Sequence, residues 1–71
     1  MKKALLMIDR GSREANVREE LEDICSIAKR KGKYDYANYC FLEVLPPYIE
    51  EGIKKCIENG ADFITIMPYF L

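Results

Sequence analysis

The feature that most constrains the fold is an uninterrupted apolar run at residues 4–8 that ends in a glycine turn. The run does not alternate with polar residues, which is typical of a strand covered on both faces in a parallel sheet between helix layers. Residues 9–12 then break the run at Gly11, and Ser12 can accept a backbone N–H as the N-cap of a following helix. The sequence therefore predicts a central strand, a tight turn and a helix.

Residues 13–31 carry the period of an amphipathic helix. Acidic residues lie toward its start and basic residues 29–31 lie at its end, an order that complements the helix dipole. Gly32 then favours a left-handed stop, and the basic cluster is interpreted as a solvated helix end. The apolar stripe that we expect to be buried consists of Val17, Leu21, Ile24 and Ala28.

Two further strands and one further helix follow. Aromatic residues favour a strand over residues 37–43. Pro46 and Pro47 cannot continue a strand interior but can open a helix, which residues 59–60 close. Residues 62–68 predict the third strand. The apolar stripe expected on the second helix consists of Ile49, Ile53, Cys56 and Ile57.

Strands and helices that alternate in this way predict a single three-layer α/β/α domain over residues 1–71. Its short parallel sheet is expected to have strand order 2-1-3, right-handed crossovers and one helix on each face. A chain of 71 residues buries only roughly 60% of its unfolded surface, so we expect marginal stability. The apolar residues 69–71 predict a domain that is incomplete at its C-terminus, or a homodimer that covers this end.

Charge and composition exclude several partners. The formal net charge is −1, so the chain lacks the basic field that gathers nucleic acid or an anionic membrane surface. The opening apolar run is shorter than the core of about 7 to 15 residues typical of a signal peptide, which predicts a cytoplasmic protein. The chain has no histidine and no C-x-x-C pair to form a zinc site. We therefore interpret Cys25, Cys40 and Cys56 as reduced thiols of the core.

The predicted topology indicates that the candidate site lies at one edge of the sheet. Ligands of open parallel sheets bind at the carboxyl ends of the strands, near the point where the strand order reverses. That edge is expected to bring together residues 9–12, 43–46 and 68–70.

The turn after the first strand has the chemistry of an anion site. Arg10 and Arg13 supply guanidinium groups. Gly11 and Ser12 add unpaired backbone N–H groups at a helix N-terminus, an arrangement that attracts phosphate or carboxylate. Neither G-x-G-x-x-G nor G-x-x-x-x-G-K-[ST] is present, so a plain connecting turn remains the alternative.

Two carboxylates are expected beside this turn. Asp9 ends the first strand and Glu43 ends the second, and such a pair is able to hold a divalent cation or to accept protons. The alternative for Glu43 is a solvent-exposed strand terminus. The sequence contains no Ser-His-Asp set and no Cys-His pair, so nucleophilic hydrolysis has no support.

Three segments together resemble the sirohydrochlorin chelatases of the CbiX type. Residues 3–16 resemble the family's opening, an apolar strand followed by His-Gly-Ser-Arg and a helix. Residues 41–47 resemble its F-L-E…P segment, and residues 60–71 resemble its G-A…V-V-P-x-F-L strand. The segments run through almost the whole chain in the family's order and spacing.

The resemblance implies a class II chelatase that inserts Co²⁺, Fe²⁺ or Ni²⁺ into sirohydrochlorin for cobalamin or siroheme biosynthesis, with no organic cofactor. The tetrapyrrole is then the partner, Co²⁺ or Fe²⁺ is the substrate metal, and Asp9 and Glu43 are the residues that steer the metal. Arg10 and Glu43 are the expected catalytic residues. The expected contacts of the substrate's carboxylates are Arg10, Gly11, Ser12 and Arg13.

Arg10 marks a departure from the family pattern. It occupies the position of the family's metal-binding histidine, and a guanidinium that stays protonated neither ligates a cation nor takes up a pyrrole proton. The family's second histidine follows the P-x-F-L strand, beyond Leu71. Two other functions therefore stay open: a histidine-less relative that holds or delivers a tetrapyrrole without metallating it, and a small anion- or nucleotide-binding α/β domain that uses Gly11 and Ser12.

Overall fold

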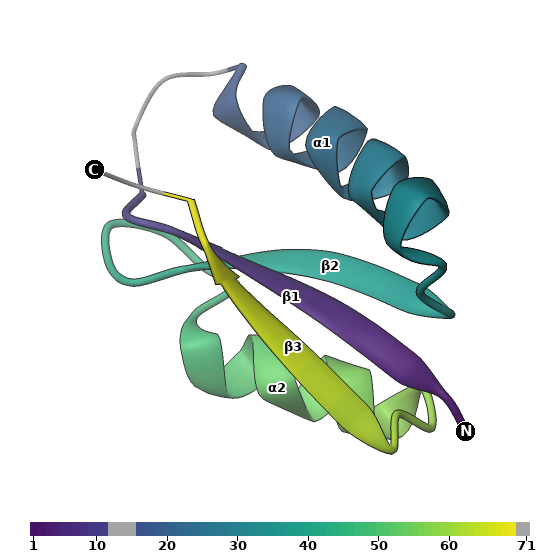
Figure 1. The fold of residues 1–71 in the computed structure, drawn as a ribbon. Coiled ribbons are helices and arrows are strands. Elements are labelled where there is room, and N and C mark those ends of the chain that lie inside the picture. The colour runs from purple at the N-terminus through teal and green to yellow at the C-terminus, as the bar shows by residue number, and fades with distance from the viewer. Residues whose placement is uncertain (12–15, 70–71) are drawn as a thin grey trace.

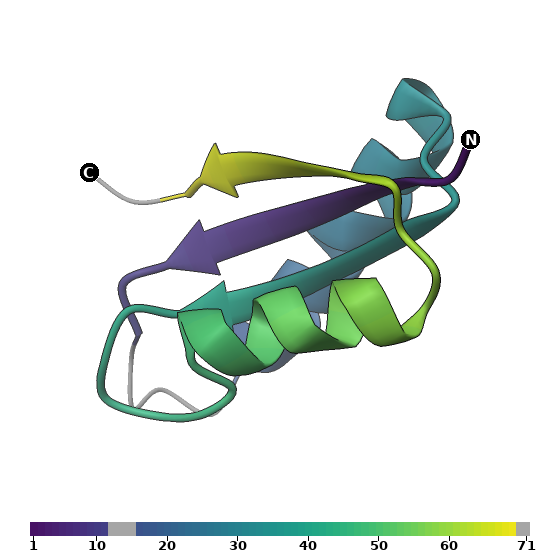
Figure 2. The same ribbon diagram turned by 90° about the horizontal axis from the view of Figure 1, so that it is seen from below.

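The computed structural model describes residues 1–11 and 16–69 and contains a three-stranded parallel sheet between two helices (Figure 1). The strand order is β2-β1-β3, and α1 and α2 cover opposite faces of the sheet, as Figure 2 shows from a second direction. The expected fold class and strand order are confirmed. In chain order the elements are β1 (Lys3–Asp9), α1 (Val17–Gly32), β2 (Tyr36–Phe41), α2 (Ile49–Glu58) and β3 (Phe63–Pro68).

The central strand β1 supplies both halves of the core. All of its residues from Ala4 to Ile8 are buried, because neighbouring side chains alternate between two covered faces. On the α2 face the buried cluster consists of Ala4, Leu6, Ile8, Cys40 and Cys56. On the α1 face it consists of Met7, Leu21, Cys25 and Phe41. The uninterrupted apolar run therefore has the two-sided burial that it predicted.

All three cysteines are free and buried, which confirms their expected place in the core. Burial raises the pKa of the Cys40 thiol to about 11, with a smaller contribution from nearby Cys56, and burial also raises the pKa of Cys56. These thiols are therefore neutral and inert at physiological pH. In the described part of the chain, no helix has the length and apolar character needed to cross a bilayer.

The ends of α1 differ from the sequence-based expectation. The N-cap is Asn16, and Ser12, which was expected in this role, lies outside the described residues. The left-handed residue that follows the helix is Lys33, with φ 56°, whereas Gly32 was predicted. Lys33 in this conformation lets the Tyr34 N–H donate back to the carbonyl of Lys29 at 3.0 Å, which closes the helix. Gly32 instead leaves room for the ring of Tyr34, which a Cβ at this position would meet at 2.3 Å.

Two other boundaries needed correction. β2 ends at Phe41 and not at residue 43, because the chain turns back and the Phe41 N–H donates to the carbonyl of Pro47 at 2.8 Å. Glu43 therefore lies in the following loop. Ile57 was expected in the buried stripe of α2 but is 62% exposed, since it lies at the margin of the face that Ile53 and Cys56 turn to the sheet.

Candidate functional site

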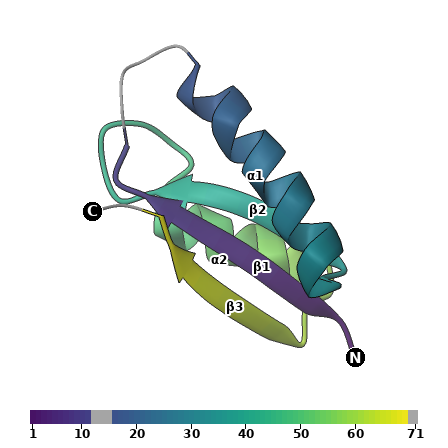
Figure 3. The same cartoon turned by 45° about the horizontal axis from the view of Figure 1, so that its top comes forward.

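The three strands end on the same side of the molecule, opposite the N-terminus (Figure 1). Their last residues, Asp9, Phe41 and Pro68, lie next to one another in the sheet. The loop after β2 lies beside the end of β1, as Figure 3 shows. We call this part of the molecule the carboxyl-end edge, and its described residues are 9–11, 42–47 and 68–69.

The turn after β1 is fixed by the carboxylate of Asp9. The Gly11 N–H donates to Asp9 Oδ2 at 3.3 Å, which is the turn that aspartate commonly forms with the backbone two residues later. The N–H of Gly11 was expected to be unpaired and open to an anion, and this expectation was wrong because the neighbouring carboxylate already accepts it. The guanidinium of Arg10, which is exposed, remains available to an anionic ligand.

Gly11 is required at its position by backbone geometry and by space. Its φ is +111°, a conformation that residues with a side chain rarely adopt. A Cβ here would lie 2.1 Å from the carbonyl oxygen of Glu43 and 3.1 Å from Cβ of Val44. The absence of a side chain at Gly11 therefore lets the turn after β1 contact the loop after β2, and these two segments together form the carboxyl-end edge beside β1 and β2.

The loop after β2 is hydrogen-bonded to the turn after β1. The Leu42 N–H donates to the carbonyl of Asp9 at 2.9 Å, and the Glu43 N–H donates to the carbonyl of Arg10 at 3.2 Å. The backbones of Arg10 and Glu43 are thus direct neighbours, as the predicted topology requires. Ser12 and Arg13, the other two expected substrate contacts, lie outside the described residues.

The tip of this loop has an unusual backbone. Val44 has φ +79°, and the Leu45 N–H donates across it to the carbonyl of Glu43 at 3.0 Å. A three-residue turn with positive φ at its centre is rare and strained, so it persists only where its surroundings hold it. The peptide bond between Pro46 and Pro47 is cis.

Apolar side chains are exposed around the charged residues of the edge. Leu42 and Val44 are each 44% exposed, and Tyr69 at the end of β3 is 45% exposed. Sequence reasoning missed the two aliphatic residues. The available signal was their place between a strand end and a proline pair, where polar loop residues are usual. Exposed apolar groups beside Arg10 suit a ligand with a flat apolar face and an anionic rim.

The carboxylates of the edge provide few metal ligands. Within residues 1–11 and 16–69, no group of three or more His, Cys, Asp or Glu side chains is arranged to hold a metal ion. Asp9 and Glu43 supply the two carboxylates of the described carboxyl-end edge.

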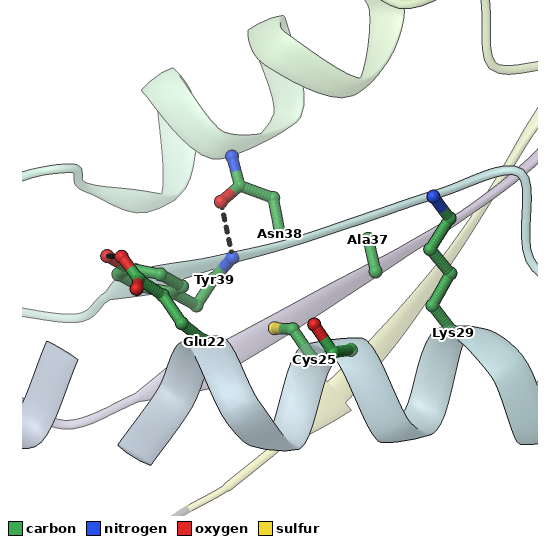
Figure 4. Close-up of a pocket in the computed structure, with 7 residues that line it drawn as sticks. Glu22, Cys25, Lys29, Ala37, Asn38 and Tyr39 are labelled. Atoms are coloured by element: carbon green, nitrogen blue, oxygen red, sulfur yellow. Dashed lines mark hydrogen bonds between the residues drawn. The ribbon is translucent and has the colours of Figure 1, made fainter. Parts of the chain in front are cut away.

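A separate pocket of about 370 Å³ lies between α1 and the outer side of β2 (Figure 4). The pocket is lined by Glu22, Cys25, Ser26, Lys29, Ala37, Asn38 and Tyr39. Burial, with a smaller contribution from Glu22, raises the pKa of Cys25 to about 11, so this thiol is not a nucleophile at neutral pH. None of these residues belongs to the carboxyl-end edge, and the pocket takes no part in the site described above.

Comparison with known proteins gives consistent matches along the chain. A family model described as CbiX matches residues 4–71. The sirohydrochlorin cobaltochelatase of Methanopyrus kandleri is 31% identical over 68 residues, which make up 96% of this chain and 48% of that protein. The sirohydrochlorin ferrochelatase of Bacillus subtilis is 31% identical over 71 residues, which make up 100% of this chain and 27% of that protein.

A solved structure shares the fold. The crystal structure of the sirohydrochlorin chelatase SirB from Bacillus subtilis subspecies spizizenii in complex with cobalt matches with a TM-score of 0.79 and 31% sequence identity. The match covers 96% of this chain and 29% of that one. The chain thus spans less than half the length of the relatives described here.

Proposed function

Because the chain belongs to the CbiX family, we propose that it binds sirohydrochlorin at the carboxyl-end edge of its sheet and takes part in the insertion of Co²⁺ or Fe²⁺. Relatives named for cobalt and for iron both match, so both metals are candidate substrates. Ni²⁺ is a third. Insertion of Co²⁺ would serve cobalamin biosynthesis, and insertion of Fe²⁺ would serve siroheme biosynthesis.

One observation carries the proposal: a cation, exposed apolar side chains and two carboxylates gather at a single edge. The guanidinium of Arg10 suits the carboxylate rim of sirohydrochlorin. Leu42, Val44 and Tyr69 offer apolar surface to the face of the macrocycle. Arg13 and Ser12 are proposed to extend the contacts with the rim.

The carboxylates supply the chemistry of metal transfer. Insertion of a divalent cation into the macrocycle releases its inner N–H protons, so the site needs a proton acceptor as well as a ligand for the incoming metal. We assign both roles to Glu43, and we assign to Asp9 the role of second metal ligand. Arg10 stays protonated and acts on the substrate's carboxylates, so its part in catalysis is electrostatic.

The relatives are longer than this chain, so the proposal concerns its share of the reaction. We propose that the domain 1–71 works with residues beyond Leu71 or with a second subunit, as in a homodimer, to enclose the tetrapyrrole. Names of the matched relatives favour metal insertion over a module that only holds the pigment, and over an anion- or nucleotide-binding domain.

Absorption spectroscopy with sirohydrochlorin tests the proposal. Addition of the protein is expected to shift the pigment's spectrum, and addition of Co²⁺ or Fe²⁺ is expected to change it again at a rate above that of the pigment and metal alone. Asp9→Ala and Glu43→Ala are expected to slow the second change, with Glu58→Ala at the far end of α2 as the matched control. Full insertion rates in both edge variants would remove the proposed metal role.

A further inference from the structure

Arg18 is placed where an arginine is normally unfavourable. It is the second residue of α1, at the positive end of the helix dipole, where acidic residues such as Glu19 and Glu20 are preferred. Its side chain leaves the helix and reaches the carboxyl-end edge. The guanidinium donates to the carbonyl of Pro46, and its Cζ lies 5.7 Å from the ring centroid of Phe41.

The loop that Arg18 reaches is the one that carries Glu43. Its first half is tied to the turn after β1 by two backbone hydrogen bonds, from Leu42 and Glu43. The strained turn centred on Val44 follows in the middle of the loop. Among the described residues, the bond from Arg18 is the one side-chain hydrogen bond that ties residues 42–47 to another element.

The two contacts of Arg18 act on neighbouring parts of this loop. Phe41, fully buried, is the last residue of β2 and marks the point from which the loop departs. Pro46 lies near the point where the loop returns to α2. A planar guanidinium can lie over a ring and donate to a carbonyl at the same time, whereas the ammonium of lysine is a point charge. One side chain thus holds both ends of the loop.

We propose that Arg18 is a positioning residue, which clamps the 42–47 loop so that Glu43 stays against Arg10 at the site. The inference rests on the proposed function of this edge in metal insertion. Arg18 acts through the loop and does not touch the substrate.

Amide hydrogen exchange tests the clamp without any substrate. Arg18→Lys and Arg18→Ala are both expected to speed exchange of the Glu43 and Leu45 amides about tenfold, the change expected for the loss of one hydrogen bond to a charged group. Amides of the β1–β3 ladder should not change. Arg30→Ala, which removes the same charge from the other end of α1, is the control. Unchanged exchange at Glu43 in both Arg18 variants would overturn the proposal.

Metallation kinetics separate positioning from simple attraction of the anionic substrate. A positioning role predicts that kcat falls about tenfold in both Arg18 variants while KM changes little, and that Arg30→Ala behaves as wild type. Recovery by Arg18→Lys, with a raised KM in Arg18→Ala, would show that charge alone matters and would overturn the proposal. A wild-type protein that leaves the pigment unmetallated sinks the proposed function, and the exchange measurement then still decides the role of Arg18 in the loop.

Discussion

The two edge strands of the sheet, β2 and β3, differ in how far other elements cover them. β2 is covered by both helices, whereas neither helix packs closely on β3 within the described part of the chain. Two outward N–H groups of β2 are capped: that of Tyr39 by the side chain of Asn38 at 2.8 Å, and that of Phe41 by the loop. On β3, Phe63 and Ile66 are 56% and 45% exposed.

Backbone alternation explains the contrast in hydrogen bonding. The Tyr69 N–H donates to Ile8 of β1, and the Phe63 N–H donates to Lys2, just before β1. The N–H groups of Ile64 and Ile66 therefore point away from β1, where no described strand follows. Pro68, with no N–H, belongs to this outward set. Among the described residues, the β1–β2 half is therefore the one whose outer strand is covered and capped, and it carries Asp9, Arg10, Glu43 and Arg18.

Matched phenylalanine truncations give the largest expected difference. Phe41→Ala removes a fully buried ring and should lower the free energy of unfolding by about 3–5 kcal/mol. Phe63→Ala should cost less than about 1 kcal/mol, because its ring is more than half exposed. Urea denaturation measures both. If Phe41→Ala leaves no folded baseline, Phe41→Leu against Phe63→Leu keeps the comparison, and equal losses would break it.

Alanine substitutions at Gly11 and Gly60 test the contact between the turn after β1 and the loop after β2. Gly11→Ala places a Cβ against the Glu43 carbonyl in a strained conformation and should cost about 2–3 kcal/mol. Gly60→Ala has φ +83° but meets only the flexible side chain of Lys2 at 3.4 Å, so about 1 kcal/mol is expected. Thermal or urea unfolding distinguishes them. Similar losses would mean that strain alone, and not the loop contact, requires Gly11.

High pH should lower the stability of the folded protein through its buried thiols. Burial raises the pKa of Cys25 and Cys40 from an ordinary value of 9.0 to about 11, so the folded protein holds these protons more tightly than the unfolded chain. Each thiol contributes up to about 1.4 kcal/mol per pH unit in this range, so stability should be complete below pH 9 and fall by up to about 2–3 kcal/mol per pH unit between pH 9 and 11. Cys25→Ala with Cys40→Ala should flatten this slope in urea titrations. A slope unchanged by the double substitution would contradict the assignment.

Amide exchange gives the smallest but most local test. In the wild-type protein, the amides of Tyr39 and Phe41 should exchange more slowly than those of Ile64 and Ile66. Asn38→Ala should cost up to about 1 kcal/mol and speed exchange at Tyr39 alone. Thr65→Ala on the open strand is the control. Equal protection of the two edges in the wild type would mean that β3 is covered in solution.

Local signals made much of the fold predictable. The run at residues 4–8 specified two-sided burial, and Gly11 marked the turn at its end, because both properties depend on near neighbours in the chain. Strand ends were less predictable. β2 stops at Phe41 because its N–H donates to the carbonyl of Pro47, and no propensity at residues 42–43 signals this contact.

The positions of the charged residues at the site could be predicted from the sequence, whereas the contacts that hold them in place could not. Parallel topology alone was enough to place Asp9, Arg10 and Glu43 at one edge. The Arg18 clamp depends on a contact across 28 positions of sequence, so an arginine early in a helix gives no local sign of it. The Gly11 N–H was wrongly expected to be unpaired, because its hydrogen bond to the Asp9 carboxylate depends on the side-chain rotamer of Asp9, which the sequence does not specify.

The central claim, that the carboxyl-end edge binds the tetrapyrrole, is tested most directly by titrating the isotope-labelled protein with metal-free sirohydrochlorin and following its amide signals by NMR. The largest shifts are expected in residues 9–11, at Leu42 to Leu45 and at Tyr69. Shifts confined to the α1–β2 pocket around Cys25 and Ala37, with the edge unmoved, would contradict it.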